Sequence, residues 1–223
     1  MGLKIVSISD THTMHKDIKV PDGDVLVHCG DWTNKGEIYD IKRFLDWFSS
    51  QSHKHKVFIA GNHELSLEGV DRNKSLNLIK SYTNDNLHFL ESSSVTIEGY
   101  KFYGSPHTPY FFGWAFNLNR GKVIANEWAK IPDDVNVLIT HGPPYGILDL
   151  VEDNTYNKGK DLHQGCEELT KRISYLRELE LHLFGHLHTD GGKSIKIKGV
   201  TYANAAICTE QYKPTNPPII VEL

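Results

Sequence analysis

Short polar clusters rich in histidine, aspartate and asparagine recur along the chain, and each directly follows an apolar run. They are Asp10-Thr11-His12, Gly30-Asp31, Gly61-Asn62-His63-Glu64, Thr140-His141-Gly142 and Gly185-His186-Leu187-His188. Imidazole, carboxylate and amide groups without a thiolate suit two borderline divalent ions, with manganese as the first choice and iron, zinc, cobalt or nickel as alternatives. The sequence therefore predicts a metal site whose ligands are Asp10, His12, Asp31, Asn62, His141, His186 and His188.

Taken singly, most of these clusters have an ordinary structural interpretation. Asp10 could be a turn aspartate beside a surface histidine, and Asp31 could close an Asx-turn. Asn62 could cap a turn. Spacing by two residues in extended backbone aims two side chains the same way, so we expect Asp10 and His12 to point alike. We also expect His186 and His188 to share a face. Their position directly after an apolar run makes this pair the most specific of the clusters.

The elements that must position these residues alternate between strand-like and helix-like segments. Continuous apolar runs of strand length, typical of sheets covered on both faces, are 3–9, 24–28, 56–60, 135–140 and 181–184. Helix-like stretches are 36–50, 70–81, 121–129 and 164–179. Segments 94–104 and 194–223 read as short consecutive strands, which predicts antiparallel additions. This pattern indicates an α/β fold, in which ligands gather at the carboxyl ends of strands.

Size and composition narrow the class of protein. The chain has 223 residues, of which 39% are hydrophobic, and we expect a single domain over 1–223. Its 24 basic and 28 acidic residues leave a net charge of −4, which disfavours a long nucleic acid as partner. No segment reaches the length needed to span a bilayer, and the three scattered cysteines predict reduced thiols. We therefore expect a cytoplasmic protein without a membrane partner.

In their order along the chain, these clusters resemble the motifs of the calcineurin-like metallophosphoesterase superfamily. Within it, further segments resemble the metallophosphoesterase-domain proteins first described in animal brain, which are phosphodiesterases; these segments are Gly30-Asp31-Trp32-Thr33, Gly113-Trp114-Ala115-Phe116-Asn117 and 214–220. The resemblance covers nearly the whole chain. It implies two facing mixed β-sheets flanked by helices, the four-layer αββα sandwich of metallophosphoesterases.

The resemblance also implies how the ligands are shared. The first metal would take Asp10, His12, Asp31 and His188, and the second would take Asp31, Asn62, His141 and His186. A hydroxide held between the two ions would attack the phosphorus in line. Asp31 and His63 would be the catalytic residues, because Asp31 bridges the ions and His63 would protonate the leaving group. Glu64 could orient a neighbouring histidine or be a plain surface acid.

Substrate contacts are less clearly marked in the sequence. The segment 102–116 contains the aromatic or imidazole side chains of Tyr103, His107, Tyr110, Phe111, Phe112 and Trp114. It could form a wall that stacks a nucleobase, or be a packed loop or a contact in a homo-oligomer. The candidate substrate-binding residues are Asn62, His63, His107 and Trp114.

The resemblance implies hydrolysis of small phosphodiesters, with cyclic nucleotides among the expected substrates. Strand ends without lysine or arginine agree with this, because a site that prefers the more highly charged monoesters usually adds a cationic clamp. The alternatives are a phosphomonoesterase or a nuclease of the same superfamily. From a different class, a metal-binding scaffold without turnover is disfavoured by the presence of His63 beside Asn62.

Overall fold

Two large β-sheets form the centre of the computed structural model, which describes residues 2–151, 158–159 and 161–223. The first sheet has the order β13-β1-β2-β3-β4. Its strands are β1 (Lys4–Ile8), β2 (Val25–His28), β3 (His55–Phe58), β4 (Leu87–Phe89) and β13 (Ile219–Glu222). The strands β1 to β4 run parallel, and β13 is antiparallel to β1. This antiparallel edge strand confirms the expectation for the C-terminal segment.

The second sheet has the order β11-β12-β10-β9-β6-β5. Its strands are β5 (Ser93–Ile97), β6 (Tyr100–Ser105), β9 (Val137–Thr140), β10 (Leu181–Phe184), β11 (Lys193–Ile197) and β12 (Val200–Asn204). Four strands are parallel, while the edge strands β5 and β11 pair antiparallel with their neighbours. A small parallel pair, β7 (Thr108–Pro109) and β8 (Asn117–Leu118), lies outside both sheets.

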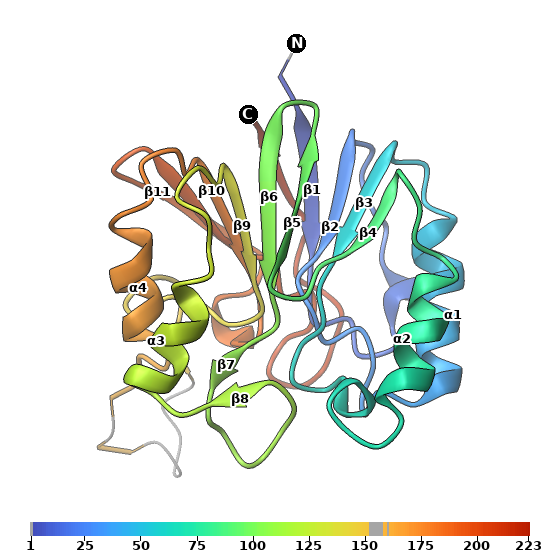
Figure 1. Cartoon of the computed structure of the whole chain (residues 1–223), viewed down its shortest axis with the longest axis horizontal. Helices are drawn as coiled ribbons and strands as arrows, with labels where there is room; N and C mark the ends of the chain where they lie inside the picture. The colour runs from blue at the N-terminus through green and yellow to red at the C-terminus, as the bar shows by residue number, and fades with distance from the viewer. Residues whose placement is uncertain (1, 152–157, 160) are drawn as a thin grey trace.

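Among the described residues, the helices α1 to α4 cover the outer faces of the two sheets (Figure 1). They are α1 (Ile38–Ser49), α2 (Arg72–Lys80), α3 (Lys122–Trp128) and α4 (Glu167–Ile173). Three short 3-10 helices, η1 (His15–Asp17), η2 (Leu65–Leu67) and η3 (His188–Asp190), lie in the connections. The helices begin and end within the sequence-predicted stretches, and α4 is shorter than 164–179 because its last residues form separate turns.

Alternating side chains along each strand explain this layering. In β1, Ile5 packs into the core between the sheets, whereas Val6 faces the outer core beneath α1 and α2, which contains Phe44. On the second sheet, Leu138 packs with the residues of α3 and α4 in a third core. Strands that are buried on both faces produce continuous apolar runs. The two facing mixed sheets flanked by helices are therefore the αββα arrangement that the sequence predicts.

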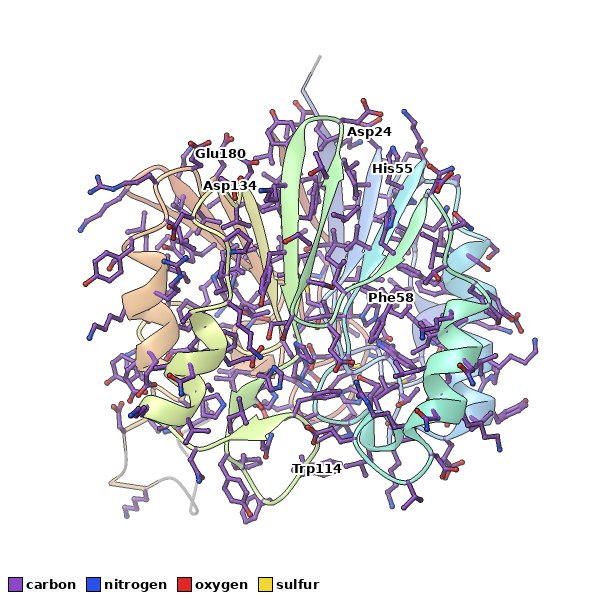
Figure 2. All side chains as sticks on the ribbon, in the orientation of Figure 1. Asp24, His55, Phe58, Trp114, Asp134 and Glu180 are labelled. Atoms are coloured by element: carbon purple, nitrogen blue, oxygen red, sulfur yellow. The ribbon has the colours of Figure 1, made fainter. Side chains whose placement is uncertain are left out.

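The carboxyl ends of the parallel strands lie along one edge of the sandwich. Figure 2 places Trp114 at this edge, whereas Asp24, His55, Asp134 and Glu180, at the amino ends of their strands, lie along the opposite edge. Both chain ends lie toward that opposite edge, where Leu3 and Leu223 exchange two backbone hydrogen bonds (Figure 1). Among the described residues, no helix is long and apolar enough to cross a membrane.

Candidate metal centre

A first group of potential ligands joins the end of β1 to the end of β10. Ligand atoms of Asp10, His12 and His188 lie within 4.8 Å of one another. Nδ1 of His188 donates to the carbonyl of Thr209 at 3.0 Å, which leaves Nε2 facing Asp10 Oδ1 at 3.4 Å. Burial alone would raise the pKa of Asp10, but the nearby imidazoles of His188 and His141 together outweigh it and hold that pKa below its usual value. Asp10 is therefore an ionised ligand within this group.

A second group joins the end of β2 to the ends of β9 and β10. Its members Asp31, His141 and His186 again place ligand atoms within 4.8 Å. Nδ1 of His141 donates to the carbonyl of Cys29 at 2.9 Å, so its Nε2 faces Asn62 Oδ1 at 2.9 Å and Asp31 Oδ2 at 3.2 Å. Burial would lower the pKa of His141, but Asp31 overrides it and raises that pKa to about 9. An imidazole nitrogen held between two oxygen acceptors is a position that favours a cation.

Asp31 and His63 connect the two groups. The Asp31 carboxylate accepts a hydrogen bond from the His63 backbone N–H at 2.8 Å, and it also lies within ligand distance of His12 and His63. Nδ1 of His63 donates to the carbonyl of Asn34 at 2.8 Å, and its Nε2 lies 3.8 Å from Asp31 Oδ2. The structure thus places Asp31 between the two groups and directs one nitrogen of His63 toward them.

Tight left-handed turns, rather than extended backbone, present several of these side chains. Asp10, His12, Asp31 and His186 all have positive φ, between 41° and 69°. Residues other than glycine rarely adopt this region, and such strain concentrates at functional sites. The extended backbone expected at Asp10 and His12 is therefore wrong, although both side chains belong to the first group. The turn at His186 directs that residue to the second group, whereas His188 lies in the first.

Two glycines allow the turns to approach so closely. A Cβ atom on Gly61 would lie 2.3 Å from Asp31 Oδ1, and one on Gly185 would lie 2.0 Å from Asp10 Oδ2. Both distances are far shorter than a nonbonded contact, so a larger residue would displace the carboxylates. The glycines that precede Asn62 and His186 in the sequence are thus required by packing against the site itself.

Glu64 is neither a surface acid nor a partner of a histidine, the two interpretations that the sequence left open. Its side chain is fully buried and accepts four hydrogen bonds. The donors are Asp31 N–H (3.0 Å), Gly61 N–H (2.7 Å), Thr33 N–H (2.9 Å) and Thr33 Oγ1 (2.8 Å). Burial, followed by the charge of Asp31, raises the pKa of Glu64 to about 8. Glu64 therefore joins the turn after β2 to the turn after β3.

We expect Glu64→Gln to weaken both the fold and metal binding. In this variant the amide NH2 group would face two of the buried N–H or O–H groups that now donate to Glu64. Because two donors would then face each other, the free energy of unfolding should fall by about 2 to 4 kcal/mol. Misplacing Asp31 should also reduce metal affinity roughly 10- to 100-fold. Denaturant titration and metal titration measure the two effects. Glu68→Gln is the matched control, because within the described part of the chain Glu68 accepts a hydrogen bond only from Phe116 N–H, and glutamine keeps an oxygen acceptor. Equal destabilisation by both variants would contradict the role of Glu64.

Two further buried histidines form hydrogen bonds with residues next to the turns that carry the ligands. The Gly30 N–H donates to His28 Nδ1 at 3.3 Å, so His28 Nε2 is the protonated nitrogen and donates to Thr11 Oγ1 at 3.0 Å. His182 Nε2 lies 2.8 Å from Thr140 Oγ1, which itself donates to the Gly142 carbonyl. Burial lowers the pKa of His28 and of His182 to about 3, so both are neutral hydrogen-bonding groups. The sequence did not distinguish them from the other histidines.

Buried polar atoms that lack a hydrogen-bond partner indicate whether these residues could bind metal ions. Among the described residues, Asp10 Oδ1 and both ring nitrogens of His12 are buried and make no hydrogen bond. Burial lowers the pKa of His12 to about 4 and that of His186 to about 3, so both imidazoles are neutral and can offer a lone pair. Such atoms are costly to bury unless a ligand satisfies them. The donor set fits divalent metal ions.

A pocket of about 340 Å³ opens over both groups of ligands. Its walls include Asp31, Asn62 and His63 on one side and His186 and His188 on another, together with Trp114. The Trp114 ring stacks on His63, with centroids 4.3 Å apart. The remaining walls are Pro109, Tyr110, Phe111, Arg120, Val151, Gln164, Leu187, Glu210 and Tyr212.

The aromatic segment 102–116 divides between this pocket and the core. Tyr103 is buried in the core beneath α3 and α4, and His107 packs edge-on against Phe116, with Nδ1 3.5 Å from Glu127 Oε1. His107 is not among the pocket walls in the described part of the chain. Tyr110, Phe111 and Phe112 are exposed, and the first two line the pocket.

Arg120 and Tyr212 are among the pocket side chains that sequence reasoning missed. Arg120 lines the pocket and donates to the carbonyls of Gly165 (2.7 Å) and Gln164 (2.9 Å). Tyr212 lies far along the chain in a segment without a metal-ligand motif. Burial, followed by the charges of Asp31 and Asp10, raises the pKa of Tyr212.

Known proteins resemble this chain in sequence over nearly its whole length. A family model described as calcineurin-like phosphoesterase matches residues 3–190. Metallophosphoesterase domain-containing protein 1 of Homo sapiens is 39% identical over 99% of this chain and 71% of its own length. A UPF0046 protein of Caenorhabditis elegans is 37% identical over 98% of this chain and 74% of its own length.

Solved structures share the fold at low sequence identity. One crystal structure superposes with a TM-score of 0.67 at 15% identity, covering 100% of this chain and 99% of its own. The sulfate thiohydrolase SoxB of Thermus thermophilus, in complex with glycerol, has a TM-score of 0.51 at 12% identity over 91% of this chain and 51% of its own. At these identities the likeness concerns the fold alone.

Proposed function

Because the chain belongs to the calcineurin-like phosphoesterase family, we propose that it is a phosphodiesterase acting on small diesters, with cyclic nucleotides among its substrates. Membership makes it a metal-dependent phosphoesterase. The choice of diester rests on one observation about the pocket. Arg120 is the only lysine or arginine among its described walls, and it is engaged by Glu167 and by two backbone carbonyls.

The charge of the substrate explains why this observation matters. A phosphate monoester carries nearly two negative charges and a diester carries one, so a site that prefers monoesters usually adds a cationic clamp beyond its metals. Here the guanidinium of Arg120 is already neutralised by Glu167. The pocket therefore matches the lower charge of a diester, and its apolar walls match an organic substituent on each side of the phosphate.

The ligand groups would hold two divalent ions, with manganese as our first choice. Asp10, His12 and His188 would hold one, Asn62, His141 and His186 the other, and Asp31 would be shared. When bound, such ions supply a nucleophilic water at neutral pH and stabilise the charge that develops on the phosphoryl oxygens.

His63 is the group placed to move a proton. Its Nδ1–H is committed to the Asn34 carbonyl, so donation from Nε2 requires the imidazolium form. Stacking on Trp114 fixes the plane of the ring. We propose that His63 donates this proton to the departing alkoxide.

A panel of matched esters tests the proposed function. With the manganese-loaded protein, kcat/KM should be higher for bis-p-nitrophenyl phosphate than for p-nitrophenyl phosphate, and cyclic nucleotides should be hydrolysed. The same panel with iron, zinc, cobalt and nickel ranks the metals. A preference for the monoester would overturn the diesterase assignment and leave the metal-dependent phosphoesterase class intact.

We expect Trp114→Ala to separate base stacking from the positioning of His63. Loss of a stacked base should raise KM for nucleotides by the equivalent of about 1 to 3 kcal/mol, with little change in KM for bis-p-nitrophenyl phosphate. Loss of the contact with His63 should lower kcat for both substrates. Steady-state kinetics on the two substrates measure both effects. If KM rose equally for both, Trp114 would have no role in recognising a base.

A further inference from the structure

Tyr212 adopts a backbone conformation that is unfavourable for a bulky residue. Its φ is +55°, in the left-handed region that favours glycine. The turn that imposes it is closed by two backbone hydrogen bonds: Tyr212 N–H donates to the Thr209 carbonyl at 2.8 Å, and Thr209 N–H donates to the Lys213 carbonyl at 2.9 Å. Strain of this kind persists where the surroundings hold the residue in place and often marks a functional position.

The same turn is tied to the metal centre. The Thr209 carbonyl that accepts the Tyr212 N–H also accepts Nδ1–H of His188 at 3.0 Å. The Tyr212 ring lies edge-on to His12, with centroids 4.8 Å apart, and its centroid is 5.5 Å from that of His188. One carbonyl therefore sets the orientation of a ligand and the position of Tyr212 together.

The Tyr212 ring lines the same pocket as Trp114. A row of neighbouring rings runs from Tyr212 to His12, then to His63 (4.7 Å from His12) and to Trp114. Within residues 2–151, 158–159 and 161–223, the Tyr212 hydroxyl donates no hydrogen bond, although Tyr212 is one of the pocket walls. A phenol is protonated at neutral pH and can donate one hydrogen bond to an anionic oxygen.

We propose that Tyr212 is a substrate-binding residue whose hydroxyl donates a hydrogen bond to a phosphoryl oxygen at the His12 and His188 side of the pocket. This inference rests on the proposed function as a phosphoesterase site. It assigns the two walls different tasks. Trp114 would recognise the organic substituent, whereas Tyr212 would recognise the phosphate that every substrate shares.

Tyr212→Phe tests the proposal, because it removes the hydroxyl and keeps the ring. For the manganese-loaded protein we expect kcat/KM to fall roughly 10- to 100-fold, by a similar factor for bis-p-nitrophenyl phosphate, p-nitrophenyl phosphate and a cyclic nucleotide. The Kd for inorganic phosphate, measured by calorimetry, should rise by a comparable factor. Metal content and melting temperature should not change. Tyr175→Phe, at an exposed tyrosine beyond α4, is the matched control.

A second variant is needed in case the phenylalanine substitution destabilises the turn. Asparagine tolerates positive φ, so Tyr212→Asn preserves the backbone and should show the same loss of phosphate binding. Values of kcat/KM and phosphate Kd within twofold of the unmodified protein would overturn the proposal. Because phosphate binding and monoester hydrolysis are both measured, failure of the diesterase assignment would not be mistaken for failure of the Tyr212 assignment.

Discussion

Replacing Asp31 with alanine is expected to remove metal as well as activity. Asp31 lies between the two ligand groups, and its carboxylate faces His12, His63 and His141. A shared anion offsets the repulsion between two dications at short range. Its loss should lower turnover by at least about 10³-fold, since several kcal/mol of charge stabilisation disappear. Elemental analysis and kinetics on the same preparation measure both effects.

The matched control for Asp31→Ala is Asp149→Asn. Asp149 is equally buried, but its carboxylate holds a loop by accepting the N–H groups of Gly146 and Gly165, each at 2.9 Å. This control should lower the melting temperature while the metal content stays that of the unmodified protein. If Asp31→Ala retained two ions per chain and normal turnover, Asp31 would not bridge the site.

The second large effect is expected from His63→Ala, which should separate chemistry from metal binding. Both ions should remain, while kcat falls roughly 10²- to 10⁴-fold, the usual contribution of general acid-base catalysis. The loss should shrink for good leaving groups, because p-nitrophenolate needs less help from a proton than an alkoxide does. Kinetics across a leaving-group series, with metal analysis of the variant, provide the measurement.

Two outcomes would contradict this role for His63. An equal loss for p-nitrophenolate and alkoxide leaving groups would exclude it as the acid. Loss of one ion would instead identify His63 as a metal ligand. Its ligand atom lies within 4.8 Å of those of His12 and Asp31, which is compatible with that role. The hydrogen bond from Nδ1 to Asn34 is compatible with either role, so metal content is the deciding measurement.

The gathering of the candidate ligands at one edge could be predicted because these residues follow strands directly. Asp10, Asp31 and His141 each come one to three residues after a buried strand, and parallel strands carry their carboxyl ends to one edge. The direction of each side chain could not be predicted. The left-handed turns at Asp10 and His186 depend on contacts with the neighbouring loop, such as the His186 N–H donating to Asp10 Oδ2 at 2.9 Å, across 176 positions of sequence.

The roles of three site residues could not be predicted, because no sequence motif marks these roles. Glu64 belongs to a recognisable cluster, but its role depends on four donors, two of them on Thr33 and none adjacent to it in sequence. Tyr212 contacts His12 across two hundred residues, and a tyrosine between polar neighbours gives no sign of this. Arg120 resembles any charged residue before a helix until the fold places it in the pocket.

Each ligand group takes members from both sheets. Asp10 and His12 follow β1 of the first sheet, while His188 follows β10 of the second, and Asp31 likewise meets His141 from across the sandwich. Bound metal ions would thus cross-link the two sheets. Sliding one sheet over the other would separate the ligands of both groups at once. Since a ligand bound only by the folded form adds RT ln(1 + [L]/Kd) to its free energy of unfolding, the free metal concentration would influence the stability of the folded chain as well as its turnover.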